Sequence, residues 1–536
     1  MRLRRRALRR PSSRGALSTP VVLRGSLAAL VLALFLVFTV APARAGDSPS
    51  AGAAEIGDPL FPGLGNGGYD VLHYHLDLRY ATSDPAQPLD GTARIVARAT
   101  QALSSFNLDF DGDSLGAVSV NRRAADWTRE GEELVVTPKR PIREGRVFVV
   151  RVSNFTSTPT VPNPQDFSTS AFFITPDGSA TAPQPDLAHR IFPSNDHPRD
   201  KASFTFRFDV PAGTDAVANG VLLDHKIDGE RSTWTYLQRQ PLATQLVQLA
   251  VGDWDFISRG RHRGVPFRDV IAPSLTAVIG PLLAVELGHL DWLEPQVGRY
   301  PFDVYGSLVV DAELGFALET QTLSIFDRVW FTDFPQGLWD PVMLHELTHQ
   351  WYGDSVSVWE WSDLWLSEGH ASWYEFLYAE EKGFLAEDTL GYPDPVGYSD
   401  FDDLMRAVYA HGDEWRAQFG PVAQPASADT LFSPNVYHGG ALVLYALRQK
   451  IGVEAFERLE RAWTDRYDGQ SASTADFIAV ASRVAGRDLT AFLEEWLYGT
   501  TTPPMPGHPD WTVNPVAQPV LMASSFKASG RPNVHR

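Results

Sequence analysis

The sequence predicts an α+β multidomain protein, with a β-rich part followed by a largely helical part. Between residues 69 and 260, short runs alternate apolar and polar residues at the two-residue period of half-buried strands, separated by Gly, Pro and Asp. From about residue 275, the apolar residues recur at helical spacing instead. A length of 536 residues, 44% of them apolar, allows two or more domains with separate cores.

The expected strands begin at Tyr69 with YDVLHYHLDLRY, which alternates in the manner of a strand with one buried face. Further β-rich runs are ARIVARAT, LVVTPKR, VFVVRVSNF, SFTFRFDV and QLVQLAVGDW. We therefore place a β-domain at residues 69–262. The preceding residues 46–68 begin with the small and polar run GDSPSAGAAEIG and are predicted to be a linker.

The second domain is placed at residues 263–502, and residues 503–536, which contain several Pro and Gly, are expected to be a loose tail. VIGPLLAVELGHLDWLEPQVG has helical spacing, and GSLVVDAEL returns briefly to strand. WDPVMLHELTHQWYG is expected to start a helix with Asp340 as N-cap and Pro341 at the first helical position. Further helices are expected at residues 363–382, 438–451, 453–467, 473–486 and 488–498.

The first 45 residues have the organisation of a secretory signal. Residues 1–24 carry eight arginines and no acidic residue, residues 27–41 are apolar, and Ala43-Arg44-Ala45 follows. Fifteen apolar residues are short for a membrane span, which needs about 20. We therefore expect cleavage after Ala45 and a secreted protein, or one held at the cell surface if the signal is not cleaved.

Cysteine content and charge exclude several kinds of site and partner. Without cysteine, the chain has no disulfide, thiolate metal site or cysteine nucleophile, so a metal must be held by His, Asp or Glu. The formal charge of −19 becomes −28 when residues 1–45, with nine arginines, are removed. A protein this acidic repels nucleic acid and anionic membranes. No later segment is long and apolar enough to span a bilayer, and the oligomeric state is left open.

The stretch HELTHQW (345–351) has the H-E-x-x-H pattern of zinc hydrolases. His345 and His349 are four residues apart, so on a helix both imidazoles lie on one side and reach a single ion. Glu346 lies about 100° around the helix, where its carboxylate reaches a water on the ion without binding the ion. The pattern is short and also occurs by chance in buried helices, so the rest of the chain decides between the interpretations.

A catalytic zinc usually takes three protein ligands and leaves one position for water, so a third ligand is expected. The metzincin pattern requires Gly three residues and His six residues after the second histidine, but Tyr352 and Ser355 stand there. Two acids remain: Glu360 in the turn VWEW, and Glu368 in the helical stretch DLWLSEGHASWYEF. Eighteen residues separate His349 from Glu368, which is enough for a loop and an antiparallel second helix.

HELTHQWYG followed by LWLSEGHASWYE resembles the zinc aminopeptidases of the aminopeptidase N and leukotriene-hydrolase type, the gluzincins. Their pattern is H-E-x-x-H, eighteen residues, then Glu in a W-L-N-E-G-x-A-like segment, and the spacing here is the same. The resemblance implies one catalytic Zn²⁺ held by His345, His349 and Glu368, with Glu346 acting on the water. Long members add a large helical domain, whereas some 35 residues follow position 500 here, so we expect a short form.

GFALET (315–320) lies where this family has G-A-M-E-N, at the family's distance before the first zinc ligand. Phe316, Leu318 and Thr320 replace the Gly, Met and Asn, but Glu319 retains the acid. In the family this Glu binds the free α-ammonium of the substrate. The resemblance therefore implies that Glu319 selects peptides with a free N-terminus, because a fixed carboxylate favours a charged amine. A surface acid beside a strand is the alternative.

NVYHGGALVLYALR resembles the family's Y-x-K-G-A helix start, although Gly439 replaces the Lys. The resemblance implies that the Tyr437 hydroxyl stabilises the oxyanion of the reaction, a role worth a few kcal/mol. A core tyrosine is the alternative. His370 stands where the family usually has Phe, and we interpret it as packing or as support for the site.

RIFPSNDHPRDKASFTFRFDVP resembles the family's F-P-C-x-D-E-P-x-x-K-A-x-F segment in the β-domain. Just before it, Gln184 falls where the family often has Gln or Glu lining the first substrate pocket. The resemblance as a whole implies a saddle-like N-terminal β-domain followed by a thermolysin-like α/β zinc-peptidase domain.

The function implied is that of a zinc metallo-aminopeptidase, which hydrolyses the N-terminal bond of peptides with a metal-activated water. One alternative is a zinc hydrolase of different specificity, an endopeptidase or a hydrolase of a non-peptide substrate, because residues 316–320 are altered. A second alternative is a non-catalytic zinc-dependent binding module. Glu346 and Tyr437 argue against that module, since binding alone requires neither.

Overall fold

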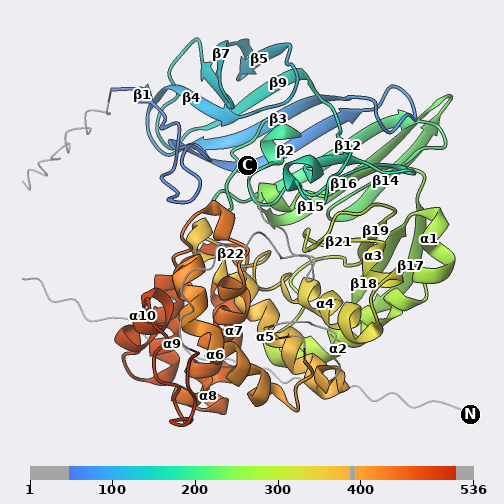
Figure 1. The fold of residues 1–536 in the computed structure, drawn as a ribbon. Helices are drawn as coiled ribbons and strands as arrows, with labels where there is room; N and C mark the ends of the chain where they lie inside the picture. The colour runs from blue at the N-terminus through green and yellow to red at the C-terminus, as the bar shows by residue number, and fades with distance from the viewer. Residues whose placement is uncertain (1–47, 387–392, 395, 515–536) are drawn as a thin grey trace, which may run out of the picture. The chain divides into compact units, whose positions relative to one another are not determined.

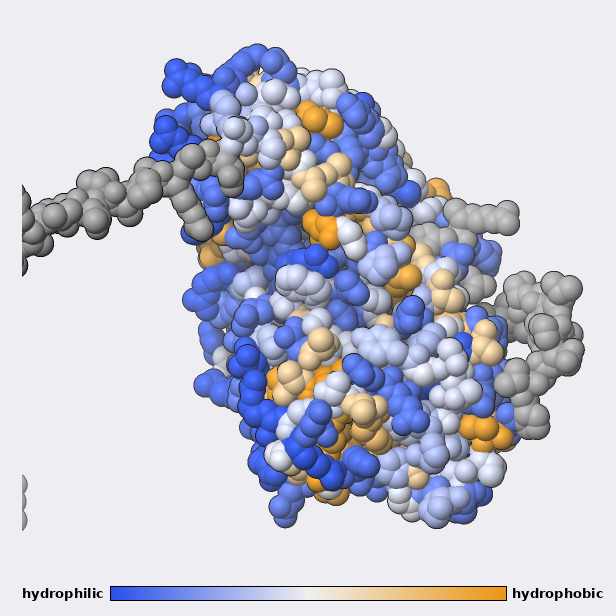
Figure 2. All heavy atoms as spheres, turned by 90° about the vertical axis from the view of Figure 1, so that its left-hand side faces the viewer, coloured by the Kyte–Doolittle hydropathy of each residue, from blue (hydrophilic) through white to orange (hydrophobic). Residues whose placement is uncertain are grey.

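The computed structural model describes three stretches of the chain, residues 48–386, 393–394 and 396–514 (Figure 1). The expected signal segment, residues 1–45, and residues 515–536 of the expected tail lie outside the described residues. On the face shown in Figure 2, hydrophilic side chains predominate and hydrophobic ones form small separate groups. Among the described residues, most large apolar side chains lie in the buried cores described below.

An eight-stranded sheet is the main element of the first domain, with its strands in the order β14, β15, β12, β2, β3, β9, β5 and β6. Alternate residues of β3 are fully buried, as expected for a sheet that is covered on one face. The strands are β2 Tyr69–Arg79, β3 Leu89–Ala99, β5 Ala117–Val120, β6 Arg123–Ala124, β9 Val147–Ser157, β12 Ala202–Pro211, β14 Val221–Asp228 and β15 Arg231–Leu242.

Two four-stranded sheets complete this domain, in the orders β1-β4-β8-β7 and β10-β11-β16-β13. Together with the large sheet they enclose one apolar core, which includes Tyr74, Phe106 and Phe204. The added strands are β1 Ser50–Ala51, β4 Leu103–Asp109, β7 Asp126–Glu130, β8 Glu133–Thr137, β10 Phe172–Ile174, β11 Gly178–Thr181, β13 Asp215–Ala218 and β16 Leu249–Gly252. The prediction of a β-rich first domain is confirmed.

The second domain combines a five-stranded sheet with helices (Figure 1). The central pairs β18–β19 and β19–β21 are parallel, and β20 adds an antiparallel strand at the edge. The strands are β17 Asp255–His262, β18 Val265–Ile271, β19 Ser307–Val310, β20 Ala317–Leu318 and β21 Ser324–Asp327, with a separate pair formed by β22 Ser357–Val358 and β23 Ser471–Ala472.

The helices predicted at residues 363–382, 438–451, 453–467, 473–486 and 488–498 are present as α5, α7, α8, α9 and α10. Within the described chain, no single helix is long and apolar enough to cross a membrane, although α1 and the stretch Leu282–Val297 meet the criterion as a bent pair. The α-helices are α1 Pro273–Ile279, α2 Glu286–Val297, α3 Val329–Thr332, α4 Gln336–Thr348, α5 Trp365–Lys382, α6 Phe401–Phe419, α7 Pro434–Ile451, α8 Val453–Tyr467, α9 Thr474–Ala485 and α10 Thr490–Tyr498.

The expected start of the helix that carries HELTH is wrong by five residues, which is more than one turn. α4 begins at Gln336, and Pro341 lies inside it rather than at its first position. Asp340 does not cap the helix, because its carboxylate accepts hydrogen bonds from His289 Nε2 (2.7 Å) and the Tyr378 hydroxyl (3.1 Å). These two partners lie on the neighbouring helices α2 and α5, and Gln336 of α4 itself donates to the other carboxylate oxygen over 3.1 Å.

The boundary expected at residues 262 and 263 also shifts. β17 pairs along its length with β18, so it belongs to the sheet of the second domain. That sheet therefore begins at Asp255, and the expected boundary divides a hairpin. The tail expected from residue 503 is packed in its described part, where Trp511 is buried and stacks on Tyr445 with ring centroids 5.6 Å apart.

The expected linker, residues 46–68, joins the two domains as a packed segment in its described part. Phe61 and Leu64 are buried in the core of the second domain. The backbone N–H of Trp361 donates to Asp58 Oδ2 over 2.8 Å. The apolar residues of this segment, rather than its polar start, decide its structure.

Candidate metal centre and substrate pocket

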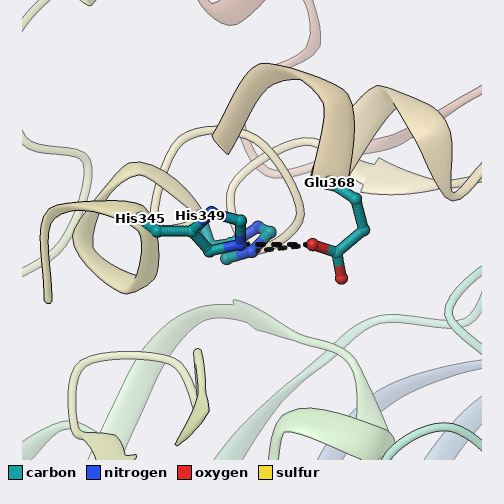
Figure 3. Close-up of side chains that lie close together, drawn as sticks. All are labelled: His345, His349 and Glu368. Atoms are coloured by element: carbon teal, nitrogen blue, oxygen red, sulfur yellow. Dashed lines mark hydrogen bonds and ion pairs between the residues drawn. The ribbon is translucent and has the colours of Figure 1, made fainter. Parts of the chain in front are cut away.

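Two helices bring the three predicted zinc ligands together. His345 lies near the end of α4, His349 is its C-terminal cap, and Glu368 lies in the first turn of α5. Figure 3 shows the two imidazoles, from one helix, pointing toward the carboxylate from the other. Nε2 of His345 and Nε2 of His349 lie 3.3 and 3.4 Å from Glu368 Oε2. All three side chains are buried.

This donor set fits a zinc ion. Ligand atoms about 2.0–2.1 Å from a tetrahedral zinc lie roughly 3.3–3.4 Å from one another, which is the separation found here. Two imidazole nitrogens and one carboxylate oxygen are also a common set at catalytic zinc sites. The three ligand atoms lie within 4.8 Å of one another.

Each imidazole is oriented by a partner on its other nitrogen. His345 Nδ1 lies 2.7 Å from Glu375 Oε2, and His349 Nδ1 lies 2.9 Å from the Ser367 hydroxyl and 3.0 Å from the Tyr352 carbonyl oxygen. These contacts direct each Nε2 toward the metal position. The sequence analysis missed Glu375 and Ser367, although Glu375 follows Glu368 by two helical turns and could have been found by that spacing.

Buried acids outnumber buried imidazoles in this region. Burial raises the pKa of Glu346 to about 7, and its Oε2 has no hydrogen-bond partner among the described residues. Burial opposes ionisation of Glu368 as well, but His349 and His345 outweigh it and hold the pKa of Glu368 below its usual range. Burial also opposes protonation of His349, yet Glu319 and Glu368 raise its pKa. The surplus of carboxylates favours a bound dication.

A third carboxylate, besides those of Glu346 and Glu368, faces the same pocket from the end of the edge strand β20. Glu319 follows this strand directly and is buried, and burial raises its pKa. Gln184 Nε2 of the β-domain donates to Glu319 Oε1 over 2.8 Å. Gln350, one residue beyond His349, donates to the Glu319 backbone carbonyl over 3.2 Å and so ties this residue to the end of α4.

Tyr437 enters the pocket from α7, with its ring 6.1 Å from that of His345 and nearly parallel to it. The approach of α7 to α5 depends on two glycines. A Cβ on Gly369 would lie 2.9 Å from Gly440 Cα, and one on Gly440 would lie 2.8 Å from Gly369 Cα. Because Gly369 follows Glu368 directly, this crossing sets the position of Tyr437 relative to the metal ligands.

One pocket contains all the predicted site residues. Its remaining walls are largely apolar and come from both domains. It is lined by Ser170, Ala182, Gln184, Phe316, Ala317, Leu318, Glu319, Trp330, Val342, His345, Glu346, His349, Glu368, Phe432 and Tyr437.

Two residues weighed in the sequence analysis lie outside the pocket. Glu360 accepts a hydrogen bond from Ser362 (2.6 Å) and does not join the ligand cluster. His370 is buried, with Nδ1 donating to the Leu366 carbonyl over 2.8 Å. Its ring stacks on Tyr352 with centroids 4.3 Å apart, so it has the packing position that we expected.

Residues 312–496 match the Peptidase family M1 domain. Glutamyl aminopeptidase from Homo sapiens is 25% identical over 329 residues, which are 59% of this chain and 33% of that protein. Aminopeptidase M1 from Arabidopsis thaliana is 25% identical over 323 residues, 58% of this chain and 36% of that protein. The chain thus spans about a third of the length of the curated relatives that it matches.

Among solved structures, an M1 zinc metallopeptidase from Deinococcus radiodurans is similar over nearly all of its length. It superposes with a TM-score of 0.72 and 29% identity, and the match covers 84% of this chain and 99% of that one. A mutant of that protein was solved with a Tyr-Ser-Ala substrate. The relatives and the ligand set together indicate a catalytic zinc ion as cofactor. Residues 312–496 thus match the peptidase family M1 domain, and the described chain has the fold of a two-domain M1 zinc metallopeptidase.

Proposed function

We propose that this protein is a zinc aminopeptidase that removes the N-terminal residue of peptides. The observation that carries the proposal is that one pocket contains two separate features. One is the cluster of candidate metal ligands with Glu346 beside it, and the other is the buried carboxylate of Glu319, which accepts a hydrogen bond from Gln184. The M1 domain match, which includes all of these residues except Gln184, supports the same activity.

His345, His349 and Glu368 would hold the metal. When bound there, zinc lowers the pKa of a bound water toward about 7 and polarises the scissile carbonyl. Glu346 accepts the proton of the attacking water and then delivers it to the leaving amine nitrogen. Its buried position suits this role, because burial brings its pKa near neutrality and leaves Oε2 without a protein partner.

The other residues bind and orient the substrate. The Tyr437 hydroxyl donates a hydrogen bond to the oxygen that gains negative charge as water attacks. Glu319 binds the α-ammonium, and the positive charge of that group favours the ionised form of this buried carboxyl. Gln184 fixes one oxygen of Glu319, which limits the carboxylate to one orientation. Substrates are therefore peptides with a free N-terminus.

The test is the rate at which the zinc-loaded protein hydrolyses a panel of aminoacyl anilides, each beside its N-acetyl counterpart. We expect cleavage of the free-amine forms only, and the ranking within the panel reports the preferred first residue. The Glu319→Gln variant should lose most of this discrimination. Equal or faster cleavage of the acetylated forms would overturn the aminopeptidase assignment and favour a zinc hydrolase of another specificity.

We further propose that the protein is exported. Residues 1–45 support this with a basic start, a short apolar run and Ala43-Arg44-Ala45. Expression in a bacterial host, followed by N-terminal sequencing of the protein outside the cytoplasm, tests it. A mature chain that starts at Gly46 is expected, whereas an intact Met1 terminus in the cytoplasm would contradict export.

A further inference from the structure

A groove on the β-domain, far in sequence from the catalytic residues, is lined by basic side chains. It lies between the β5–β6 hairpin and the loop that leads from β8 to β9, and its volume is about 460 Å³. Its charged lining consists of Arg123, Lys139, Arg140, Arg143 and Arg146, with no acidic residue. We call this the arginine groove. Acidic residues outnumber basic ones 65 to 46 in the chain, so the composition of the groove is opposite to that of the whole.

Four of these side chains lack a charge partner. Lys139 pairs with Asp126, with both carboxylate oxygens 2.7 Å from Nζ. No described residue forms an ion pair or a side-chain hydrogen bond with the four arginines of the groove, and all four are exposed. Like charges close together repel, so such a cluster costs stability unless an anion neutralises it.

The backbone beneath the groove is held in place. Ile142 is buried and exchanges two hydrogen bonds with Leu103, of 2.8 and 2.9 Å. Gly145 donates to the Ala99 carbonyl, and Ala99 in turn donates to the Arg146 carbonyl over 3.0 Å. Arg140, Arg143 and Arg146 therefore stand on a loop with a fixed backbone, and Arg123 stands on strand β6, which lowers the entropy cost of binding a ligand.

In a second arginine-lined hollow, by contrast, two of the four arginines are paired with acids. It is lined by Arg239, Arg261, Arg263 and Arg299, but also by Glu294 and Asp303. Arg239 pairs with Asp303 over 2.8 Å, and Arg263 pairs with Asp291 and Glu294. The four arginines of the arginine groove have no acid partner among the described residues, so an anionic ligand can supply the opposite charge.

We propose that the arginine groove binds a ligand that carries two or more phosphate groups. A guanidinium presents a planar fork that hydrogen-bonds two phosphate oxygens at once, and several forks converge best on a group with many acceptor oxygens. The groove shares no lining residue with the substrate pocket, so the proposal is independent of the aminopeptidase activity.

Calorimetric titration of the intact protein with fructose 1,6-bisphosphate, beside unphosphorylated fructose, tests the proposal. At low salt we expect binding of the bisphosphate only, weakening as salt rises because the groove is exposed. The Arg143→Gln/Arg146→Gln variant should bind at least about tenfold more weakly, since two forks are lost. Hydrolysis of aminoacyl anilides should be unchanged, which shows that the variant is folded.

The matched control is Arg239→Gln/Arg263→Gln, which removes two arginines from the second arginine-lined hollow and should leave binding unchanged. Absence of binding to the unmutated protein, or equal weakening in both variants, would overturn the proposal. Sedimentation with vesicles of phosphatidylcholine and cardiolipin, a lipid whose headgroup carries two phosphates, then identifies the phosphate source. Sedimentation that the groove variant abolishes would assign a lipid headgroup, and bisphosphate binding without sedimentation would assign a soluble ligand.

Discussion

The two sides of the substrate pocket are held in different ways. On the helical side, His345, Glu346 and His349 lie within five residues of one helix, and Glu368 comes from the helix packed against it. On the opposite side, Gln184 and Glu319 are 135 residues apart, come from different domains and meet through one hydrogen bond. The first arrangement depends on local geometry and the second on how the domains pack.

This difference corresponds to the proposed roles of the two sides, which are hydrolysis on the helical side and selection of the substrate on the strand side. The helical side supplies the proposed metal ligands and proton carrier, all of them buried, and side chains of α5 orient the two imidazoles. The strand side supplies Glu319, the group proposed to bind the substrate amine. Changes on the helical side should therefore abolish turnover, whereas changes on the strand side should alter which substrates are accepted and how tightly.

Loss of a metal ligand should have the largest effect. In His349→Ala, two ligands remain, so we expect zinc to be lost on dialysis and anilide hydrolysis to fall on the order of a thousandfold or more. Elemental analysis and rate measurements check both. His411→Ala, which changes a histidine on α6 outside the pocket, is the control. A full zinc complement in His349→Ala would refute the ligand assignment.

Loss of the proton carrier should spare the metal. We expect Glu346→Gln to retain zinc and to lose about 10²–10⁴-fold in kcat, because the amide cannot accept the proton of the attacking water. KM should change little, since the substituted side chain has the same shape. Near-normal turnover of the zinc-loaded variant would remove Glu346 as the base.

A smaller effect on zinc binding is expected when the residue that orients a ligand is changed. Glu375→Gln weakens the hydrogen bond that orients His345, and we expect zinc affinity to fall about 10–100-fold. Competition with a chelator measures this, and excess zinc should restore most of the activity. Glu381→Gln, an exposed change on the same helix, should have no effect. Unchanged affinity in Glu375→Gln would leave His345 oriented by packing alone.

The smallest effect is expected on the strand side. Gln184→Ala removes the donor that fixes Glu319, so we expect KM for free-amine anilides to rise several-fold with kcat nearly unchanged. Steady-state kinetics on one good substrate and its acetylated form check this. A fall in kcat at constant KM would show instead that Gln184 acts on the transition state, and would erase the contrast between the two sides.

Local features of the fold were predictable from the sequence, and features that depend on distant partners were not. The spacing of His345 and His349 follows from helical geometry, so their convergence on one ion could be predicted before the structure, whereas Glu368 was chosen over Glu360 by the resemblance to a family. Asp340 is a residue type typical of an N-cap, yet its carboxylate accepts a hydrogen bond from His289, which lies 51 residues earlier in the chain. The alternation of β17 predicts a strand but does not say which sheet that strand joins.

The site itself shows the same limit. Glu319 and Tyr437 were predicted from a resemblance to a family, because nothing in their local sequence requires them to face the metal ligands. The crossing of α5 and α7 at Gly369 and Gly440 could not be predicted, since a glycine within a helix has several explanations. Glu375, the partner of His345 that the sequence analysis missed, could have been predicted from helical spacing alone.

The packed segment before the β-domain has a consequence for the order of folding. Asp58 and the residue it binds, Trp361, are 303 positions apart. When the chain grows from its N-terminus, Phe61 and Leu64 leave the ribosome long before the helices that bury them exist. This segment is therefore synthesised early in the described chain but buried late. A nascent chain that stops before α5 leaves these apolar side chains exposed to chaperones and proteases.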